Sequence, residues 1–301
     1  MKIIVTGSSG FVGSSLGLHL KETGKFHVSP LNARMPFSSS DVSNALAIVH
    51  LAGKAHDLKN TTKRDQYFSI NRDLTIKLFD LFLKSDIRDF FFFSSVKAVK
   101  DTATGVLTED DLPDPLTAYG QSKQEAEAYL MNQKLNDGKR LFIIRPCMIH
   151  GPGNKGNLNL LYSVVKKGIP YPLAAFENKR SFLSIDNLNY IIERILKDEK
   201  IEGGIYNVSD DEPLSTNKVI EVIARASGLK PRLWKINKSV VKGLASVGDK
   251  LHLPLNSERL KKLTESYVVS NKKIKKALNI NKLPLSSSEG LSLTINSFTN
   301  E

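Results

Sequence analysis

The sequence predicts an α/β protein with a doubly wound parallel sheet and a smaller α+β lobe toward its C-terminal end. Two observations support this prediction. Buried strand-like runs alternate with helical segments along the first half of the chain, which is typical of a parallel sheet. A glycine-rich turn, Thr6-Gly7-Ser8-Ser9-Gly10-Phe11-Val12-Gly13, directly follows the first of these runs. Glycines at that place mark the strand-to-helix turn of a Rossmann-type fold.

The predicted elements follow one another in a regular order. The apolar runs that predict strands are 2–6, 26–31, 45–52, 89–95 and 140–145, the fourth with four consecutive phenylalanines. The segments with helical periodicity are 11–23, 71–84 and 118–136. Short strands at 181–185 and 204–208 are expected to return to the main sheet, and 215–228 is expected to be a helix. Ligands of such sheets bind beyond the carboxyl ends of the strands, so the turns there should meet in one crevice.

One strand-and-helix unit is missing from this order. Only ten residues separate Arg34 from Ala45, where the next buried strand begins. A complete unit needs more chain than that. We therefore predict that the third strand is truncated and that this edge of the sheet is short. Asp41 lies in the shortened segment, and capping of a short helix is a better interpretation of it than contact with a ligand.

Composition argues against several classes of function. The net charge of +12 at pH 7 comes mostly from scattered lysines, without an arginine-rich arm or zinc-ligand spacing. Nucleic-acid binding is therefore not expected, whereas attraction of an anionic substrate is. No run of about 18 apolar residues occurs, so integral membrane association is not expected. The single cysteine, Cys147, excludes an internal disulfide and fits a cytoplasmic location.

Two motifs carry chemistry. Gly7 permits the sharp reversal from strand to helix, Gly10 lets the main chain approach a phosphate, and Gly13 lets the helix pack closely on the sheet. Tyr119 and Lys123 lie four residues apart in a predicted helix and so face the same way. A nearby ammonium group lowers the pKa of a tyrosine from about 10. The two motifs together indicate a bound dinucleotide and hydride transfer on an alcohol or ketone.

The series of motifs resembles that of the extended short-chain dehydrogenase/reductases, the nucleotide-sugar epimerase/dehydratase family. The matching segments are TGSSGFVG (6–13), VHLAG (49–53), the helix around Asn71, FFSSVK (92–97), YGQSK (119–123), RP...HGPG (145–153), KRSFLSIDNL (179–188) and YNVSD (206–210). They cover nearly the whole chain. Within the family, SSVKAVK, HGPGNKGN and NKRSFLSIDNL look most like the subgroup that reduces UDP-4-keto-6-deoxy-N-acetylglucosamine to UDP-N-acetylquinovosamine, for bacterial surface polysaccharides such as O-antigen.

The resemblance implies roles for particular residues. The catalytic set would be Ser95, Tyr119 and Lys123, with Tyr119 giving a proton to the sugar oxygen and Ser95 and Tyr119 touching the substrate. The residues implied at the cofactor are Gly7, Ser9, Gly10, Phe11, Val12, Gly13, Asn32, Arg34, Leu51, Ala52, Gly53, Asn71, Tyr119 and Lys123. Arg180 would bind the substrate diphosphate, or else form a surface salt bridge. Asn157 would contact the nucleotide, or else cap a helix. No metal ligand is implied.

Two departures from the family pattern bear on the reaction. Dehydratases of the family carry an Asp-Glu pair directly after the catalytic hydroxyl, but Val96-Lys97 stands here, so dehydration is not expected. The second strand ends in Leu31-Asn32-Ala33-Arg34. It lacks the acidic residue that binds the ribose hydroxyls of NAD, while an arginine can bind the 2′-phosphate of NADP. NADP is therefore preferred over NAD, with an exposed Arg34 of no ligand role as the alternative.

Taken together, the motifs predict NAD(P)H-dependent reduction of the 4-keto group of a UDP-4-keto-6-deoxy-N-acetylhexosamine. A UDP-hexose or UDP-N-acetylhexosamine 4-epimerase is the first alternative, and a non-catalytic nucleotide-binding subunit the second. We expect a dinucleotide-binding domain over 1–150, with a returning segment near 181–212, and a mainly substrate-binding lobe over 151–301. The resemblance also implies a homodimer through the helix 118–136. Its apolar side chains could equally belong to the core of one chain.

Overall fold

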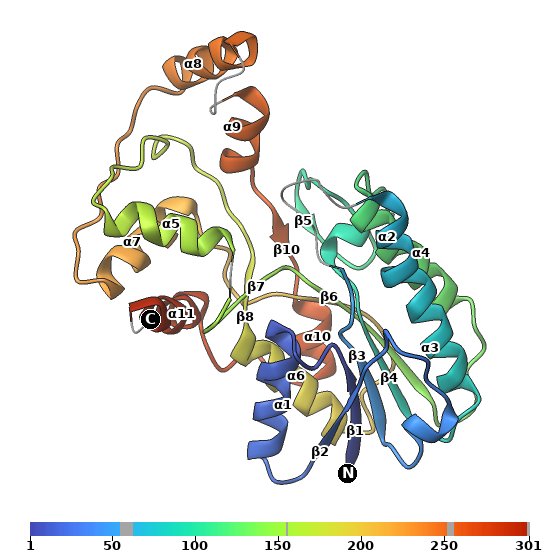
Figure 1. Ribbon diagram of the computed structural model, residues 1–301. Coiled ribbons are helices and arrows are strands. Elements are labelled where there is room, and N and C mark those ends of the chain that lie inside the picture. Colours follow the sequence, from blue (N-terminus) through green and yellow to red (C-terminus); the bar gives the residue numbers. More distant parts are fainter. Residues whose placement is uncertain (55–62, 155, 252–255, 300–301) are drawn as a thin grey trace.

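A six-stranded parallel sheet forms the body of the computed structural model, which describes residues 1–54, 63–154, 156–251 and 256–299. The strands in spatial order are β2 (His27–Leu31), β1 (Lys2–Thr6), β3 (Ala47–His50), β4 (Asp89–Phe93), β6 (Arg140–Pro146) and β9 (Gly204–Val208). Each neighbouring pair is parallel, so all the carboxyl ends meet at one edge of the sheet (Figure 1). The predicted fold class is confirmed.

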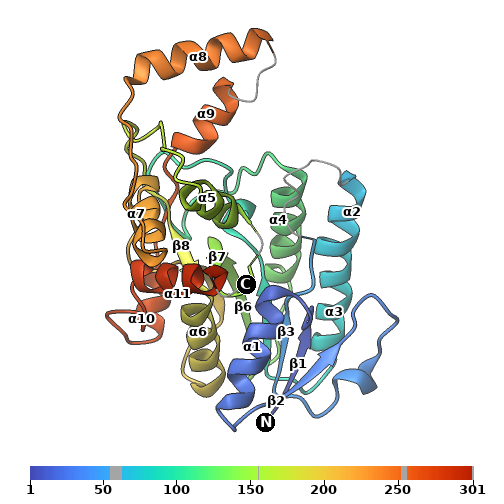
Figure 2. The same cartoon turned by 60° about the vertical axis from the view of Figure 1, so that its left-hand side comes forward.

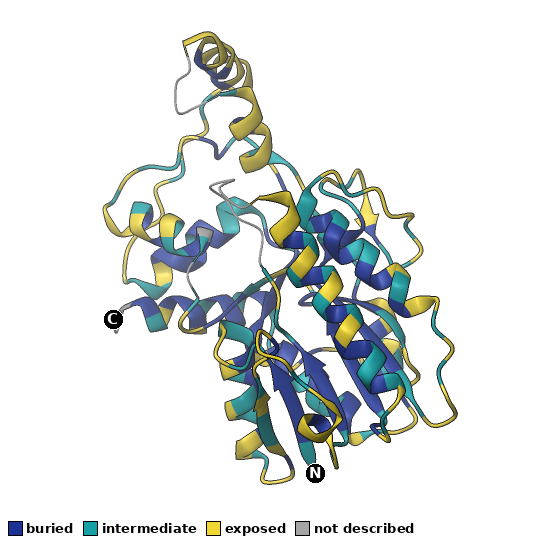
Figure 3. Ribbon diagram, turned by 45° about the vertical axis from the view of Figure 1, so that its right-hand side comes forward, coloured by how far each residue is buried: buried dark blue, intermediate teal, exposed yellow. Residues whose placement is uncertain are grey.

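Helices cover both faces of the sheet. On one face lie α1 (Phe11–Glu22) and α6 (Ile185–Lys197), which contact each other. On the other lie α3 (Leu74–Leu83) and α4 (Ala118–Met131). Figure 3 shows the buried strands between helices whose outer surfaces are exposed. This two-sided burial explains why the central strands β3 and β4 are buried along their whole length rather than on one face alone.

The four consecutive phenylalanines of β4 show this burial most directly. Side chains alternate between the faces of a strand. Phe90 and Phe92 accordingly pack with α3 and α4, whereas Phe91 and Phe93 pack on the side of α1 and α6. Asp89, at the start of the strand, is also buried and accepts two hydrogen bonds from Arg140.

The sheet is cut short beyond β2, where the truncated third strand was predicted. Among the strands that the structure describes, β2 pairs with β1 alone and forms the edge of the sheet. The chain runs from β2 to β3 with only a 3₁₀ turn, Ser39–Val42, between them. Pro30 lies in this edge strand, where its missing N–H costs no ladder hydrogen bond. Asp41 caps the turn, because its carboxylate accepts hydrogen bonds from the main-chain N–H and hydroxyl of Ser38. The capping interpretation of Asp41 is confirmed.

Part of the C-terminal half forms a second layer beyond the carboxyl ends of the strands (Figure 2). Three of its helices share a core: α5 (Asn157–Lys166), α7 (Thr216–Ala226) and α11 (Ser287–Thr299). The remaining elements are α2 (Arg64–Phe68), β5 (Val106–Leu107), β7 (Met148–His150), β8 (Phe182–Ser184), α8 (Lys238–Leu251), α9 (Ser257–Thr264), β10 (Val268–Val269) and α10 (Lys272–Ala277). Within the described ranges, none of the helices combines the length and apolarity needed to cross a bilayer.

One predicted strand has a different partner. Residues 181–185 were expected to return to the main sheet, but β8 pairs with β7 in a separate two-stranded sheet. The expectation was wrong because β6 already has β4 on one side and β9 on the other. Both edges of β6 are thereby occupied, so β8 pairs instead with β7, the continuation of the chain beyond β6. The other predicted returning strand, β9, does join the main sheet.

Candidate active site

The glycine turn after β1 is packed so closely that only glycine fits at two positions. Gly7 has φ +67°, and a Cβ atom there would lie 2.7 Å from the main-chain nitrogen of Ala52. A Cβ atom on Gly13 would lie 2.3 Å from the carbonyl oxygen of Gly7. The turn therefore brings the start of α1 against the end of β3. Ser9 is exposed on this turn, whereas Phe11 and Val12 are half-buried at the start of α1.

The start of α1 fits a pyrophosphate group. Gly10 is the N-cap residue and provides no side chain to satisfy the first main-chain N–H groups of the helix. Those groups have no partner inside the helix and carry its positive dipole end. No acidic residue lies in the first turn. An anionic ligand therefore meets donors without a competing negative charge, as dinucleotide binding requires.

A buried histidine fixes the loop after β3. His50 Nδ1 lies 2.7 Å from Thr6 Oγ1, and its Nε2 lies 2.9 Å from Thr75 Oγ1. The Thr75 hydroxyl donates to the carbonyl of Asn71, and Ala52 N donates to Thr6 Oγ1. This network assigns the proton of the neutral imidazole to Nε2 and makes Nδ1 an acceptor. Burial, with the charge of Lys123 adding to it, lowers the pKa of His50 to about 3, so the ring stays neutral.

Asn71 lies on a π-helical turn, Ser69–Asp73, between α2 and α3. Its buried amide donates to Ser122 Oγ and to the carbonyl of Lys54, and accepts from Lys54 N over 2.7 Å. Such a turn bulges out of the helical repeat and re-aims a side chain. Asn71 thus ties α4 to the loop after β3. A Cβ atom on Gly53 would lie 3.1 Å from Asn71 Oδ1, which keeps this corner of the site narrow.

Lys123 is buried beneath that loop. Its ammonium donates to the carbonyl oxygen of Phe93 over 2.7 Å and lies 4.7 Å from the ring centroid of Phe92. A Cβ atom on Gly53 would lie 3.3 Å from Lys123 Nζ. Burial lowers the pKa of Lys123 to about 8, although the negative charge of Glu127 opposes this shift. The group is therefore a cation that titrates close to neutral pH.

Of the two serines at the end of β4, Ser95 is the one that contacts Tyr119. The Ser95 hydroxyl shares a hydrogen bond with the Tyr119 phenol and accepts another from Lys97 N. The Ser94 hydroxyl is buried without a hydrogen-bond partner in the described part of the chain. The serine hydroxyl beside Tyr119 in this structure is therefore that of Ser95.

The electrostatic expectation for Tyr119 was wrong. Lys123 was expected to lower the pKa of Tyr119, but the pKa of Tyr119 is raised because the effect of burial outweighs that of the hydrogen bond with Ser95. The ring of Tyr67, 6.1 Å away between centroids and nearly perpendicular, lies on another side of the phenol. The Lys123 ammonium is engaged by a main-chain carbonyl instead. Tyr119 is accordingly protonated at neutral pH, which suits a proton donor.

Two of the side chains that follow β2 are exposed to solvent. Asn32 and Arg34 are both exposed, and Asn32 Oδ1 accepts a hydrogen bond from Arg34 N over 3.2 Å. Among the described residues, the truncation after β2 leaves no neighbouring strand over them. The exposed Arg34 guanidinium can therefore meet an anionic group at this edge of the sheet.

Two predicted substrate contacts lie outside the group gathered around Tyr119. The Arg180 guanidinium donates to the main-chain carbonyl oxygens of Lys262 and Glu265, at the end of α9, and its Nη2 lies 3.7 Å from Glu265 Oε1. It therefore holds α9 in this structure. Asn157 begins α5, but its side chain lies outside what the structure describes. The N-cap of α5 is Gly156, whose N–H is bonded by Asn159 Oδ1, so Asn157 is not the helix cap.

A buried ion pair behind Lys123 was not predicted. Glu127, one helical turn after Lys123, accepts hydrogen bonds from Arg145 Nε at 3.0 and 3.1 Å, and a shorter one from Arg145 Nη2. Both side chains are almost wholly buried. No local pattern in the sequence indicated it, because Arg145 lies on β6 and Glu127 on α4. His50, Thr6, Thr75 and Tyr67 were also not assigned roles from the sequence.

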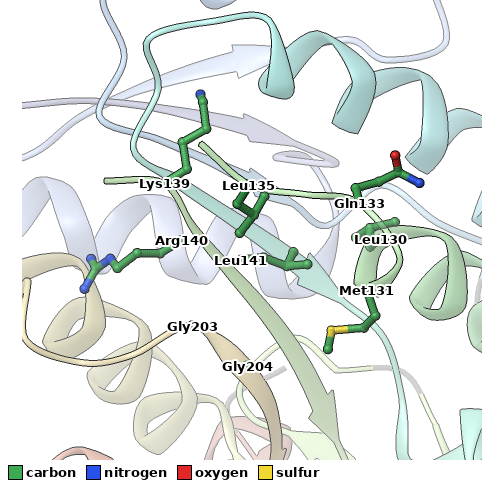
Figure 4. A pocket seen from close by; sticks show the side chains of 9 residues that line it. All are labelled: Leu130, Met131, Gln133, Leu135, Lys139, Arg140, Leu141, Gly203 and Gly204. Atoms are coloured by element: carbon green, nitrogen blue, oxygen red, sulfur yellow. The ribbon is translucent and has the colours of Figure 1, made fainter. Parts of the chain in front are cut away.

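One surface hollow among the described residues lies away from these side chains. It has a volume of about 290 Å³ and opens near the amino ends of β6 and β9, at the opposite edge of the sheet (Figure 4). Its lining residues are Leu130, Met131, Gln133, Leu135, Lys139, Arg140, Leu141, Gly203 and Gly204. None of the candidate site residues lines it. In the described ranges, no group of three acidic, histidine or cysteine side chains could hold a metal ion.

Comparison with known proteins identifies the family. The model of the NAD dependent epimerase/dehydratase family matches residues 3–209. The chain belongs to the NAD dependent epimerase/dehydratase family. It is 33% identical over 258 residues to a UDP-glucose 4-epimerase of Vibrio cholerae, covering 78% of this chain and 77% of that protein. The predicted membership in the extended short-chain dehydrogenase/reductases is thereby confirmed, and the chain is an enzyme.

Other relatives show how broad the family is. A GDP-6-deoxy-D-mannose reductase of Pseudomonas aeruginosa is 25% identical over 241 residues, covering 74% of this chain and 79% of that protein. The solved UDP-glucuronic acid 4-epimerase of Bacillus cereus, in complex with NAD, superimposes with a TM-score of 0.77 at 19% identity, covering 100% of this chain and 97% of that one. Epimerases and reductases of nucleotide sugars thus share this architecture.

Proposed function

We propose that this member of the epimerase/dehydratase family is an NAD(P)H-dependent reductase. Its substrate would be a UDP-4-keto-6-deoxy-N-acetylhexosamine, and its product UDP-N-acetylquinovosamine or the C4 epimer, for surface polysaccharide synthesis. The observation that supports a net reductase is the truncated edge of the sheet, where β2 pairs with β1 alone among the described strands. The end of a bound dinucleotide nearest that edge would be less enclosed, which would favour its exchange. A reductase must exchange its cofactor at each turnover, whereas an epimerase retains it.

The choice between NADP and NAD rests on the end of β2. No acidic side chain follows the strand there, and Arg34 is exposed. A guanidinium binds a phosphate with several donors, whereas an acidic residue would repel it. We therefore propose NADPH as the preferred reductant. When bound, the reduced nicotinamide supplies the hydride that reaches C4 of the sugar.

The protein side chains would supply the proton and the positioning. Tyr119, protonated at neutral pH and hydrogen-bonded to Ser95, would donate its proton to the sugar O4 as that oxygen gains negative charge. Ser95 would hold the same oxygen. Lys123, fixed by the carbonyl of Phe93, would place a positive charge nearby and stabilise the resulting phenolate. Val96 and Lys97 follow Ser95 in place of an acid-base pair, so elimination of water has no catalyst here.

The test is to mix purified protein with NADPH and UDP-4-keto-6-deoxy-N-acetylglucosamine and follow reduced cofactor and product together. The proposal predicts one NADPH oxidised for each sugar reduced, with NADH slower. Interconversion of UDP-N-acetylglucosamine and UDP-N-acetylgalactosamine without added cofactor would contradict it and identify a 4-epimerase. Calorimetry of NADPH binding measures the affinity of the chain for the cofactor independently of turnover.

A 4-epimerase is the second candidate, because the Vibrio cholerae relative at 33% identity is a UDP-glucose 4-epimerase. The same Ser95, Tyr119 and Lys123 would serve that reaction. The proposal also includes a cytoplasmic location, which the free, buried Cys147 supports. A homodimer through α4 would need other contacts than Ala126 and Leu130, since both are buried in the core of this chain.

A further inference from the structure

The α8–α9 arm, made of α8 (Lys238–Leu251) and α9 (Ser257–Thr264), stands apart from the rest of the molecule. Figures 1 and 2 both show it at the end farthest from the N-terminus, beyond the carboxyl ends of the strands. α8 packs against α9. A small core of four buried side chains supports the arm, with Val241 and Ala245 from α8, Leu260 from α9 and Leu173 from the segment before them.

A neighbouring side of α8, next to the side that packs in this core, carries an exposed apolar stripe. Its members are Val240, Leu244, Val247 and Leu251, which are 54%, 58%, 48% and 64% exposed. Their spacing of four, three and four residues places them in one narrow line along the helix. Figure 3 shows the arm largely exposed, with burial confined to its inner side. The single tryptophan, Trp234, is 57% exposed just before α8.

The arm is also strongly basic. Residues 238–264 contain six lysines and arginines and two acidic residues, which gives a net charge of +4 with His252 neutral. On α8, Lys238 and Lys242 fall on the polar face, and Lys250 falls nearer the edge of the stripe. One acidic residue, Glu258, is already paired with Lys262. A narrow apolar stripe on a lysine-rich helix is the pattern of helices that lie in the surface of an anionic bilayer.

We propose that α8 docks on the surface of an anionic lipid membrane through Val240, Leu244, Val247 and Leu251. The stripe would enter the boundary between headgroups and acyl chains while the lysines remain near the lipid phosphates. A second copy of this chain is a poorer occupant, because a two-fold contact along the stripe would bring the same lysines of both arms together. Because the arm lies on the carboxyl-end side of the sheet, docking would turn the carboxyl ends of the strands, where the candidate active site lies, toward the membrane. The chain would then bind reversibly, without a spanning segment.

Flotation of the full chain with lipid vesicles tests this proposal. We expect binding to vesicles of phosphatidylglycerol and phosphatidylethanolamine, weak binding to phosphatidylcholine alone, and weaker binding as salt is raised. Leu244→Gln/Val247→Gln should weaken binding by about tenfold or more, since two half-exposed apolar side chains lose their burial in lipid. The matched control is Leu18→Gln/Leu112→Gln, at positions 64% and 83% exposed on other surfaces, and it should bind like the wild type.

Lysine variants measure the electrostatic contribution to vesicle binding separately from that of the apolar stripe. Lys238→Gln/Lys242→Gln/Lys250→Gln should reduce binding to anionic vesicles more than Lys21→Gln/Lys25→Gln/Lys134→Gln, which removes the same charge from positions elsewhere on the molecule. Equal loss in both triples, or equal binding of the stripe variant and its control, would overturn the proposal. So would a dimer, seen by analytical ultracentrifugation without lipid, that Leu244→Gln/Val247→Gln dissociates, because the stripe would then belong to a second copy.

Discussion

The ammonium group of Lys123 donates a hydrogen bond to the main-chain carbonyl oxygen of Phe93 over 2.7 Å, at the end of the central strand β4. This bond fixes a buried cation one helical turn from Tyr119. Because burial lowers the pKa of Lys123 to about 8, the charge on which the proposed chemistry depends is lost under mildly alkaline conditions.

The first prediction follows from that pKa. The ammonium form predominates below about pH 8 and disappears as the pH rises through it, so kcat/KM for the keto sugar should fall above about pH 8. Tyr119 cannot cause this fall, since its own pKa is raised from 10.0. Lys123→Arg should be slower but lack the alkaline fall, because a guanidinium does not titrate in this range. An unchanged alkaline limb in Lys123→Arg would exclude Lys123 as its source.

Replacement of the proton donor should abolish turnover without loss of binding. Tyr119→Phe removes the phenolic proton but keeps the ring beside Tyr67, so kcat should fall by about 10²–10⁴ while the Kd for NADPH stays the same. Tyr129→Phe is the matched control on the same helix, since its phenol donates to Asp80. Retention of most activity by Tyr119→Phe would mean that another group protonates the sugar.

The buried His50 makes stability depend on pH. Its folded-state pKa of about 3 lies below the ordinary histidine value of 6.5, so the unfolded chain binds a proton that the folded chain excludes. The stabilisation is therefore complete above pH 6.5 and is lost as pH falls toward 3, at about 1.4 kcal/mol per pH unit. Urea unfolding across this range should show a shallower pH slope for His50→Gln than for wild type. His27→Gln, at an exposed position, should keep the wild-type slope.

Arg34 should determine the preference for NADPH. Arg34→Gln removes the exposed guanidinium at the end of β2 and should weaken NADPH binding by about tenfold, the value of one charge-assisted contact. NADH binding should change little, because it lacks the 2′-phosphate. Arg225→Gln removes another exposed arginine, from α7, and serves as the control in calorimetry. Equal weakening of NADPH and NADH binding would show that Arg34 does not contact the 2′-phosphate.

The pair formed by Glu127 and Arg145 should be costly to break. Glu127→Gln leaves a buried guanidinium without its carboxylate, so the free energy of unfolding should fall by about 3–5 kcal/mol. Urea denaturation measures the loss. Glu258→Gln breaks the exposed pair with Lys262 on α9 and should leave stability unchanged within error. Equal stability of Glu127→Gln and wild type would mean that water reaches Arg145.

Local patterns in the sequence were sufficient for the sheet, the glycine turn and the truncated edge. The glycines at 7, 10 and 13 and the buried runs around them have short-range causes, and ten residues between Arg34 and Ala45 exclude a strand-and-helix unit by length alone. The position of Asp41 as a cap was likewise visible from its neighbours. These features follow from main-chain geometry and burial, and both can be inferred from short stretches of the sequence.

Contacts between distant segments were not predictable in the same way. The partners of His50 are 44 and 25 residues away in the sequence, and Glu127 meets Arg145 from a different element. The pKa of Tyr119 depends on how deeply the ring is buried, which a spacing of four residues does not reveal. Arg180 matched a motif, but its guanidinium contacts the end of α9, because the fold brings residues 262 and 265 to it.

Transfer of an isotope from the cofactor tests the central proposal most directly. The protein would be supplied with UDP-4-keto-6-deoxy-N-acetylglucosamine and NADPH carrying deuterium at the hydride position, and the product examined by mass spectrometry and NMR. A reductase should place about one deuterium at C4 of every product molecule and yield equal amounts of oxidised cofactor and product, with neither formed by Tyr119→Phe. Recovery of the keto sugar without deuterium and of NADPH without oxidation, while the same preparation interconverts UDP-N-acetylglucosamine and UDP-N-acetylgalactosamine, would contradict the proposal.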